Sequence, residues 1–393
     1  MWRSLTLTFV NATVVGPDER LYESIRIRGS EIDGLGVEPD RRDLVVDLEG
    51  GIVLAGLINA HDHLELNSFT RLKWRPRYVN VGEWIADFQP RFKTEPRLVG
   101  ARRETLADRL WVGGLKNLLS GVTTVCHHNP LHRPLKDRFP VRILRRFGLS
   151  HSLQIDGKRV ARAYRKTPRD WPWIIHAAEG IDDDARSEIT TLNRLGCLGA
   201  NTVLVHGVAI NGDAERVLQT GASLIWCPTS NQFLFGCTAR VRRFDEAGRL
   251  AIGTDSRLSG EGDLLDEIRA AHRTRQIGAV SILRAVTTQA AAVLRLTRAG
   301  RLEPGQPADL TILGRLSTDP FESIVLSSRQ DVRLTMRDGE PLLADERMAE
   351  IFHARRESCT RAWVDGSERW LAKWIARRAA RLALEEPGLL IEA

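Results

Sequence analysis

The stretch GIVLAGLINAHDHLEL, residues 51–66, is an apolar run that ends in two histidines with an aspartate between them. The run has the composition of a buried strand, and polar groups at its end cost free energy unless they are paired or bind a ligand. Side chains two apart on a strand point the same way, so His61 and His63 can reach one ion, whereas Asp62 points away. Taken alone, this spacing also fits ordinary core or surface histidines.

Similar apolar runs follow along the chain, and helical stretches separate them. Strand-then-helix alternation over residues 51–301 predicts an α/β fold with a parallel sheet closed into a (β/α)8, TIM-like barrel. Polar side chains end these runs, and catalytic groups of such barrels gather at the C-terminal strand ends, so we expect them to converge. These side chains are His61, His63, His127, His128, His176, Glu179, His206 and Asp255.

Strand-like segments with glycine-containing turns occupy both ends of the chain. Residues 1–50 and 302–345, the latter with an Asp338-Gly339 hairpin signal, predict a composite small β-sandwich domain around a catalytic barrel at 51–301. Residues 346–393 are rich in Arg, Ala, Trp and Leu at helical spacing, which predicts a C-terminal helical extension. Between His128 and His176 the chain is short for two full β/α units, so we expect a shortened strand 3–4 region.

The charge and the cysteine content limit the kinds of binding partner and the cellular compartment that we expect. The net charge is +7 and the pI is about 9.4, but the arginines are spread along the chain without a nucleic-acid-binding motif. We therefore expect a small-molecule substrate, with an anionic heterocycle as one option, and neither nucleic acid nor a membrane as partner. Five cysteines without a CxxC pair predict reduced thiols and a cytoplasmic protein.

Four of the strand-end residues form a candidate metal site: His61, His63, His176 and Asp255. Three imidazoles and one carboxylate suit one divalent ion, with Zn²⁺ as the first choice and Fe²⁺ as the other ion that prefers these donors.

The motifs around these residues resemble the amidohydrolase superfamily, and within it the mononuclear-metal, deaminase-like branch of cytosine, guanine and S-adenosylhomocysteine deaminases and triazine hydrolases. GLINAHDH is similar to the branch's Gly-x-x-Asn-x-His-x-His motif, and the other motifs follow in the family's order. They are IIHAAEG (174–180), LVHG (204–207), CPTSNQFLFG (227–236), GTDS (253–256) and RLEPGQPADL (301–310).

The resemblance implies a metal-dependent hydrolase of a non-peptide C–N bond, and most of all hydrolytic deamination of an amino-substituted heterocycle by a metal-activated water. Asp255 would take the proton of that water, and Glu179 would pass a proton to a ring nitrogen and then to the leaving amine. His206 would orient the hydroxide or stabilise an oxyanion. The alternatives are ring-opening of a cyclic amide or imidazolone, a triazine-type hydrolase, and a scaffold protein without catalysis. Related enzymes are often homo-oligomers, and we expect one here.

Substrate contacts are harder to assign, because the branch's strand-four motif is absent. His151 is the nearest polar candidate there, and His127 or His128 could contact the substrate from strand two. Asn231 belongs to a pair with Ser230 that we expect to shape the loop after strand seven. The basic, tryptophan-containing segment 70–92 resembles a lid, with Trp84 and Arg71 as candidate contacts. A carbamylated Lys158 bridging two metals is a minor alternative.

Overall fold

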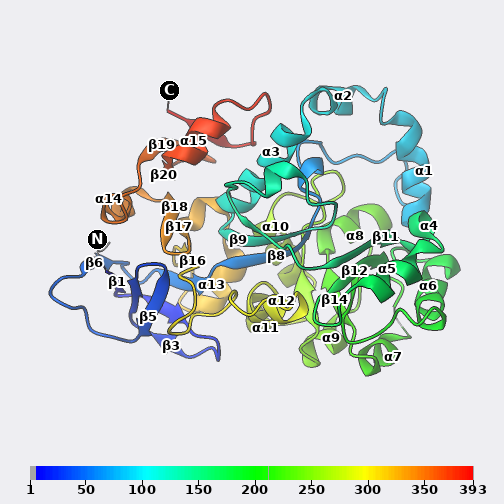
Figure 1. Cartoon of the computed structure of the whole chain (residues 1–393), viewed down its shortest axis with the longest axis horizontal. Helices are drawn as coiled ribbons and strands as arrows, with labels where there is room; N and C mark the ends of the chain where they lie inside the picture. Colours follow the sequence, from blue (N-terminus) through cyan, green and yellow to red (C-terminus); the bar gives the residue numbers. More distant parts are fainter. Residues whose placement is uncertain (1–5, 211, 393) are drawn as a thin grey trace.

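The computed structural model describes residues 6–210 and 212–392 of the chain. Figure 1 shows a strand-rich part, built from both ends of the sequence, beside a larger part in which strands alternate with helices. Residues 1–5, which include the start of the first predicted strand segment, lie outside the described residues.

Eight parallel strands form the larger part, in the order in which they occur in the chain. Hydrogen bonds join the first three in one sheet and the other five in a second sheet, in the order of the sequence. The strands are β8 (Leu57–Asp62), β9 (Val122–His127), β10 (Arg142–Ile143), β11 (Gly148–Ser152), β12 (Trp173–Ala177), β13 (Thr202–His206), β14 (Ser223–Trp226) and β15 (Leu250–Ile252). The parallel α/β prediction is confirmed, but the hydrogen bonds between strands do not close into the predicted barrel and leave two separate sheets.

The break lies in the region that the sequence marked as short. Strand β10 has two residues, which pair with Thr124 and Val125 of β9, and residues 144–147 pass to β11 without a helix. A strand this short offers too few backbone groups to pair on both sides. Next to β10 lies a cavity of about 1010 Å³, lined in part by Leu144, Leu294 and Arg142. The first strand, β8, meets the segment that follows the last strand, β15. There the Thr254 and Asp255 amides donate to the His61 carbonyl at 2.9 and 3.1 Å.

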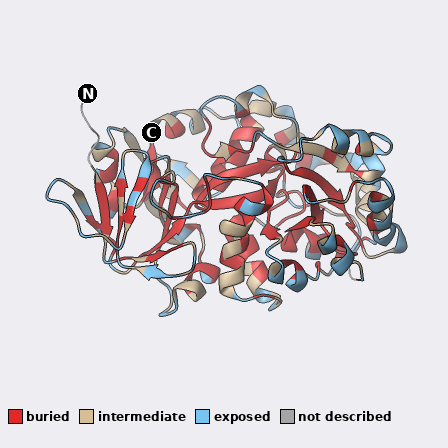
Figure 2. Ribbon diagram, turned by 60° about the horizontal axis from the view of Figure 1, so that its bottom comes forward, coloured by how far each residue is buried: buried red, intermediate tan, exposed pale blue. Residues whose placement is uncertain are grey.

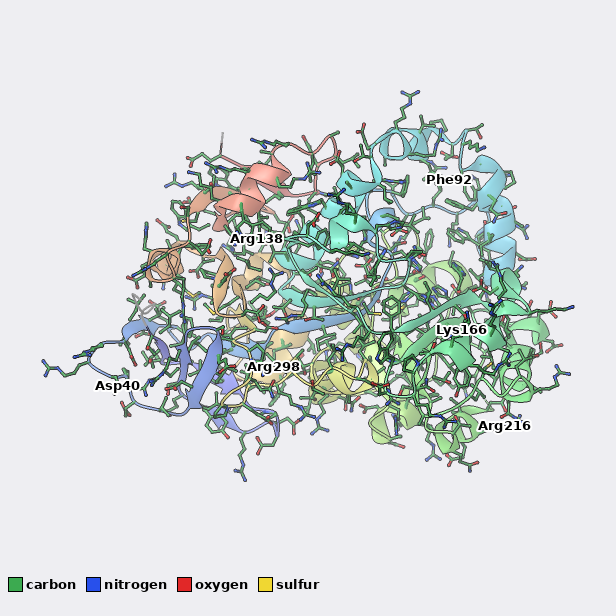
Figure 3. All side chains as sticks on the ribbon, in the orientation of Figure 1. Asp40, Phe92, Arg138, Lys166, Arg216 and Arg298 are labelled. Carbon is green, nitrogen blue, oxygen red and sulfur yellow. The ribbon has the colours of Figure 1, made fainter. Side chains whose placement is uncertain are left out.

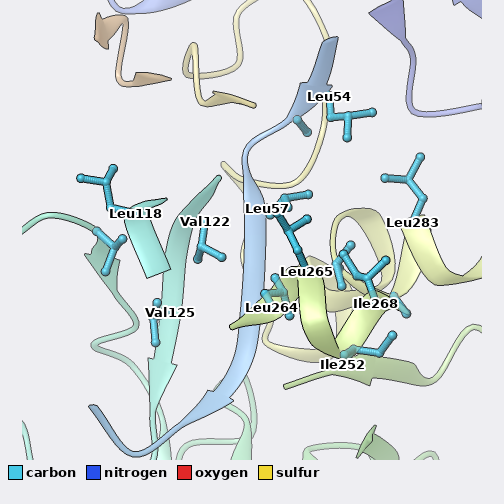
Figure 4. Close-up of a cluster of buried hydrophobic side chains, with 14 of the residues drawn as sticks. Leu54, Leu57, Leu118, Val122, Val125, Ile252, Leu264, Leu265, Ile268 and Leu283 are labelled. Atoms are coloured by element: carbon cyan, nitrogen blue, oxygen red, sulfur yellow. The ribbon is translucent and has the colours of Figure 1, made fainter. Parts of the chain in front are cut away.

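Helices cover the outer faces of these strands and carry apolar side chains inward. Figure 4 shows leucine, isoleucine and valine side chains between β8, β9, β15 and α10 (Leu264–Arg273). Leu57, Val122, Ile252 and Leu264 among them are all fully buried. Each such side chain contributes about 1.5–3 kcal/mol relative to exposure, so this packing holds the strand ends in place. The other helices of this part are α1 (Val81–Arg91), α2 (Pro96–Arg103), α3 (Leu106–Leu119), α4 (Leu153–Asp156), α5 (Arg159–Lys166), α6 (Asp183–Arg194), α7 (Ala214–Gln219), α8 (Pro228–Phe235), α9 (Arg242–Glu246), α11 (Ala279–Ala285) and α12 (Thr288–Val293).

Two further sheets make up the strand-rich part, which both chain ends build. A four-stranded sheet has the order β5-β4-β1-β6 and a nine-stranded sheet the order β21-β19-β20-β18-β17-β16-β7-β2-β3. Strand β7 (Ile52–Ala55) belongs here rather than to the barrel, so the apolar run 52–58 is divided between the two parts at Gly56. The remaining strands are β1 (Leu7–Val10), β2 (Thr13–Val15), β3 (Leu21–Tyr22), β4 (Ile25–Arg28), β5 (Glu31–Leu35), β6 (Leu44–Asp47), β16 (Leu310–Leu313), β17 (Val332–Arg337), β18 (Glu340–Ala344), β19 (Cys359–Val364), β20 (Ser367–Ala372) and β21 (Leu389–Ile391).

The C-terminal segment differs from the predicted helical extension. It contributes three strands to the nine-stranded sheet and contains two short helices, α14 (Glu350–Ala354) and α15 (Lys373–Ala379). Its β19–β20 hairpin turns at Asp365 and Gly366, both of which have positive φ, at 48° and 84°. An Asp-Gly pair favours such a two-residue turn, and this preference outweighs the helical spacing of the flanking apolar residues.

The end of the chain docks on the barrel through a buried carboxylate. Glu386 is 3% exposed and accepts from Arg257, beyond β15, at 2.6 and 2.7 Å. Arg329, in the connection between α13 (Pro320–Leu326) and β17, donates to the same carboxylate at 2.8 Å and also holds Asp365. Arg257 therefore ties this segment to the loop that carries Asp255, and Arg329 ties it to the connection before β17.

The surface is polar and the strands lie inside. Figure 2 shows buried strands in both parts, with exposed residues concentrated on helices and loops. In Figure 3 charged side chains such as Asp40, Lys166, Arg216 and Arg298 extend outward from separate regions of the molecule, in keeping with dispersed basic charge. All five cysteines are free thiols. Among the described residues, none of the helices has the length and apolarity to cross a bilayer.

Candidate metal centre and catalytic residues

The ends of three strands bring the candidate ligands together. His61 lies at the end of β8 and His63 directly after it, and Asp62 between them forms a parallel bridge to Asp255. His176 lies near the end of β12, next in the sheet to β13. Because the strands run parallel, their C-terminal ends share one edge, and the four side chains are all buried there.

Four donor atoms from these residues face one another. The Nε2 atom of His176 lies 3.2 Å from Nε2 of His61 and 3.3 Å from Nε2 of His63. Asp255 Oδ1 lies 3.6 Å from Nε2 of each of His61 and His63. Four ligands at about 2.1 Å around a tetrahedral ion are about 3.4 Å apart, so the spacing fits one divalent cation.

The protonation of the cluster also fits a cation. Burial lowers the pKa of His63 and of His176 well below the usual histidine value, so both rings are neutral near pH 7 and keep a lone pair to donate. Burial opposes ionisation of Asp255, but the contributions of His61, His206 and His63 together outweigh it, and the pKa of that carboxyl lies below its usual value. Neutral imidazoles and an anionic carboxylate are the forms that bind Zn²⁺ or Fe²⁺.

Neighbouring groups orient the candidate ligands. His176 Nδ1 lies 2.8 Å from the His151 carbonyl oxygen. That oxygen accepts a hydrogen bond from Nδ1–H, so the other ring nitrogen, Nε2, carries no proton. The Ser230 and Ser259 hydroxyls donate to Asp255 Oδ2 at 2.8 and 2.5 Å, and Oδ1 therefore faces the histidines. Asp255 has a φ of 57°, a conformation that a non-glycine residue adopts at a cost and that the surrounding contacts maintain.

Gly253 lets the β15 end approach His61 closely. A Cβ atom at residue 253 would lie 2.6 Å from the His61 Cβ and 2.7 Å from its backbone nitrogen. We expect Gly253→Ala to displace His61 and to weaken metal affinity by about 10- to 100-fold, as loss of a ligand-orienting contact does. A chelator-competition titration measures this affinity. Gly100→Ala in α2, where a Cβ meets nothing within 4 Å, is the control; equal affinities for the two variants would contradict the prediction.

Glu179 and His206 lie beside the donor cluster. Glu179 follows β12 by two residues, and its Oε1 lies 3.5 Å from Nε2 of His206, the last residue of β13. Burial, and after it the charge of Asp255, raises the pKa of Glu179 well above the usual carboxyl value. A carboxylic acid that stays protonated near neutral pH can donate a proton to a bound substrate.

The hydrogen bonds of His206 determine which of its ring nitrogens carries the proton. Its Nδ1 lies 2.9 Å from Oδ1 of Asn231, whose amide nitrogen in turn donates to Thr238 at 3.3 Å. Burial lowers the pKa of His206 to about 4, so the ring is neutral, with its proton on Nδ1 and a lone pair on Nε2. His206 therefore accepts a hydrogen bond toward the cluster, which favours the water-orienting role over oxyanion stabilisation.

The α8 helix that carries Ser230 and Asn231 rests on a second buried acid. Glu267 of α10 accepts from the Thr229 amide at 3.1 Å and from the Thr229 hydroxyl. Burial raises the pKa of Glu267 from 4.5 to about 8. Between these values the folded state holds a proton that the unfolded chain has released, so stability falls as the pH rises from about 4.5 to about 8.

We expect Glu267→Gln to remove this dependence, because an amide donates to and accepts from Thr229 without titrating. Relative to the wild type, the variant should gain on the order of 3 kcal/mol of unfolding free energy between pH 5 and pH 8. Urea unfolding at the two pH values measures the difference. Glu261→Gln, at an exposed position, is the control, and a parallel pH dependence of wild type and Glu267→Gln would refute the expectation.

The candidate substrate contacts fall into two groups. The rings of His128 and His151 lie 4.5 and 4.7 Å from the ring of His176, so both line the cluster, and Asn231 reaches it through His206. His127 instead faces Glu65 at 3.8 Å. Lys158 is exposed at the start of α5. Two groups of side chains in the described part of the chain are close enough to hold a metal ion, and Lys158 belongs to neither of them.

The lid candidates contact neighbouring loops and helices. The Trp84 indole donates to the Leu72 carbonyl at 3.0 Å and its ring stacks on Phe88 at 5.1 Å. The guanidinium of Arg71 lies over the ring of Phe233, in α8, at 4.7 Å. The Arg71 contact attaches the segment 70–92 to α8, whereas both Trp84 contacts lie within the segment. A direct role of Trp84 or Arg71 with the substrate stays a prediction.

Sequence reasoning missed a buried polar network behind the metal ligands. Lys116 of α3 is fully buried, and its Nζ lies 3.0 Å from Oδ2 of Asp62 and 2.8 Å from Oδ1 of Asn67. Asn117 donates to the same Asp62 oxygen at 2.7 Å. The sequence does indicate this network. Residue 116 falls on the apolar stripe of α3 with Val112, Leu115 and Leu119, and a lysine at such a position requires a buried partner.

Known proteins resemble this chain over nearly its whole length. Residues 169–342 match the sequence model of the amidohydrolase family. The 5-methylthioadenosine/S-adenosylhomocysteine deaminase of Haloquadratum walsbyi is 32% identical over 426 residues, covering 88% of this chain and 94% of that protein. The protein of the same name from Halobacterium salinarum is 27% identical over 422 residues, covering 91% and 97%.

Solved structures share the fold. A triazine hydrolase variant superposes with a TM-score of 0.70 at 18% identity, covering 90% of this chain and 99% of that one. The 5-methylcytosine deaminase from Klebsiella pneumoniae, liganded with 5-fluorocytosine, superposes with a TM-score of 0.63 at 19% identity, covering 86% and 98%. These likenesses support the TIM-barrel type of architecture despite the open ladder. The near full-length relative at 32% identity and the match to the family's sequence model lead to one conclusion: the chain belongs to the amidohydrolase family.

Proposed function

We propose that this protein is a metal-dependent aminohydrolase that removes the amino group of an adenosine-type nucleoside by hydrolysis. The observation that carries the proposal is the buried acid Glu179, 3.5 Å from His206, beside three histidines and Asp255 whose donor atoms fit one divalent cation. The 5-methylthioadenosine/S-adenosylhomocysteine deaminases among the relatives support the choice of substrate class.

His61, His63, His176 and Asp255 would hold the ion. A divalent cation bound there lowers the pKa of a water molecule from about 15.7 toward about 7 and makes it a nucleophile at neutral pH. The lone pair on His206 Nε2 orients that water, and the Asp255 carboxylate takes its proton as oxygen attacks the ring carbon that bears the amino group.

Glu179 completes the proton transfers. Its Oε1 proton goes to the ring nitrogen next to the attacked carbon, which carries the negative charge that the attack displaces. Glu179 then recovers the proton that Asp255 took from the water and passes it to the amino group. The carbon–nitrogen bond breaks and ammonia leaves. The hydroxyl group on the former amino carbon gives up its remaining proton, which returns through Asp255 to Glu179, and the carbonyl product forms. One water is therefore consumed for each ammonia released, and Glu179 is protonated again.

Ammonia release from defined nucleosides tests the proposal. Purified protein loaded with Zn²⁺ is incubated with 5′-methylthioadenosine, S-adenosylhomocysteine, 5′-deoxyadenosine and adenosine, with cytosine, guanine and an aminotriazine as comparison substrates. We expect ammonia and the ultraviolet change of the purine ring in equal amounts from at least one adenosine compound, and none after chelation. A ring-opening hydrolase would change the absorbance without ammonia, and an inert metal-loaded protein would end the proposal.

Three finer features belong to the same proposal. Zinc is the proposed ion, because three imidazoles and one carboxylate match its preference, and metal analysis of the purified protein tests it against iron. The five free cysteines favour a cytoplasmic location. A homo-oligomer is proposed from the family resemblance, with sedimentation of the purified protein as its test.

A further inference from the structure

His128 is held at the edge of the candidate metal centre by its backbone. It follows β9 directly, is fully buried, and its amide donates to the Asp62 carbonyl, between the two β8 histidines, at 3.0 Å. The neighbouring His127 faces the other way, with its Nδ1 3.3 Å from the Leu64 amide. Of the two adjacent histidines, only His128 therefore enters the donor cluster.

The outward hydrogen bonds of His128 determine where its proton lies. Its Nε2 is 3.1 Å from the Ser150 carbonyl and 3.3 Å from the Ile174 carbonyl. Carbonyl oxygens only accept hydrogen bonds, so Nε2 carries the proton and Nδ1 carries a lone pair.

The lone pair on Nδ1 has no partner among the described residues, although the atom is buried. A buried acceptor without a partner is costly, and each one in a native fold calls for an explanation such as a bound ion. The ring of His128 lies 4.5 Å from that of His176 and 4.9 Å from that of His61. Donor atoms of His61, His63, His128 and His176 all lie within 4.8 Å of one another.

We propose that His128 is an additional ligand of the metal ion and binds it through Nδ1. The four imidazoles of His61, His63, His128 and His176 then face one cation, and the centre is richer in nitrogen than a set of three imidazoles and one carboxylate. Nitrogen donors favour late transition metals over Mg²⁺ and Mn²⁺, so His128 also sharpens metal selectivity. The inference rests on the metal centre of the proposed function and is independent of the substrate.

Cobalt provides a spectroscopic test, because its visible absorption depends on coordination number. Wild type, His128→Asn and the matched control His127→Asn are loaded with Co²⁺, and the dissociation constant and the visible spectrum are recorded. We expect His128→Asn to bind Co²⁺ at least 10-fold more weakly and to absorb more strongly, as a centre with fewer ligands does. His127→Asn should match the wild type in both measurements.

A crystal structure of the zinc-loaded wild type decides the matter without a substitution, including the case in which His128→Asn does not fold. A distance of about 2.1 Å from His128 Nδ1 to the ion supports the proposal. A zinc ion bound by three imidazoles and Asp255, with unchanged cobalt affinity and spectrum in His128→Asn, overturns it and leaves the proposed function standing. A protein that binds neither zinc nor cobalt overturns both.

Discussion

Replacing Glu179 by glutamine is expected to lower kcat by about 10²- to 10⁴-fold, the range that loss of a general acid–base group produces. Glutamine keeps the volume of the side chain and a hydrogen-bonding oxygen near His206, but it cannot donate and recover a proton. Glu179 is not among the four proposed ligands, so zinc content should match that of the wild type. Steady-state kinetics on the best adenosine substrate, with metal analysis of the same samples, makes the measurement.

The pH dependence separates a proton-transfer role from a structural one. The proposed mechanism begins with Glu179 protonated, and burial raises the pKa of that carboxyl well above its usual value. The wild-type kcat should therefore decline as the pH rises through that raised pKa, whereas the residual activity of Glu179→Gln should lack this decline. A similar decline in both proteins would assign the titration to another group.

Glu188→Gln provides a matched control for Glu179→Gln. Glu188 is a half-buried carboxylate near the end of β12: partial burial raises its pKa to about 7, and it accepts from the Ala178 amide at 2.7 Å. It lies on α6 and does not contact His206, so its substitution should change kcat by no more than a few-fold. If the two variants lose activity equally, the loss in Glu179→Gln reflects damage to the strand end rather than a missing proton donor.

The positions of the candidate ligands follow from two regularities that a sequence carries. The alternation of side chains on a strand separates His61 and His63 from Asp62, and parallel strands place their C-terminal ends at one edge. Neither argument needs a tertiary contact. For this reason the sequence alone is sufficient to predict that residues 61, 176 and 255 lie at the same site.

The distinction between His127 and His128 required the structure. Alternation implies that only one of two adjacent strand-end residues faces the cluster, but the choice depends on the register between β8 and β9. That register shifts between Asn59 and Asp62, so counting from the strand start gives no answer. The shift places His128 beside His61 and turns His127 toward Glu65.

The C-terminal segment shows a different reason for failure. Asp365-Gly366 carries the same hairpin signal as Asp338-Gly339, which the structure confirms between β17 and β18. The helical prediction used only the spacing of the apolar residues, and their intervals also fit a strand over a short segment. Local turn chemistry was the better guide, because a two-residue turn leaves few alternatives to a hairpin.

Lys116 is the residue whose replacement should cost the fold most. Its ammonium group and the Asp62 carboxylate are both fully buried, 3.0 Å apart, between α3 and the strand that carries His61 and His63. Removing one partner of a buried pair leaves the other charged and without compensation, at a cost of about 3–5 kcal/mol. We therefore expect Lys116→Met to lower the free energy of unfolding by that amount, measured by urea denaturation of the metal-free protein.

The double variant Lys116→Met/Asp62→Asn tests whether the loss comes from the unpaired charge. Asparagine keeps hydrogen-bonding atoms for Asn117 and Asn67 but carries no charge, so the double variant should recover most of the stability that Lys116→Met loses. Lys166→Met, at an exposed lysine on α5, should change stability by less than about 0.5 kcal/mol. If the double variant were as unstable as Lys116→Met alone, lost packing of the lysine stem would be responsible. Because Asp62 lies between two proposed ligands, the double variant should also recover zinc affinity. Such a result would show that the buried Lys116–Asp62 pair helps to position the metal ligands on β8.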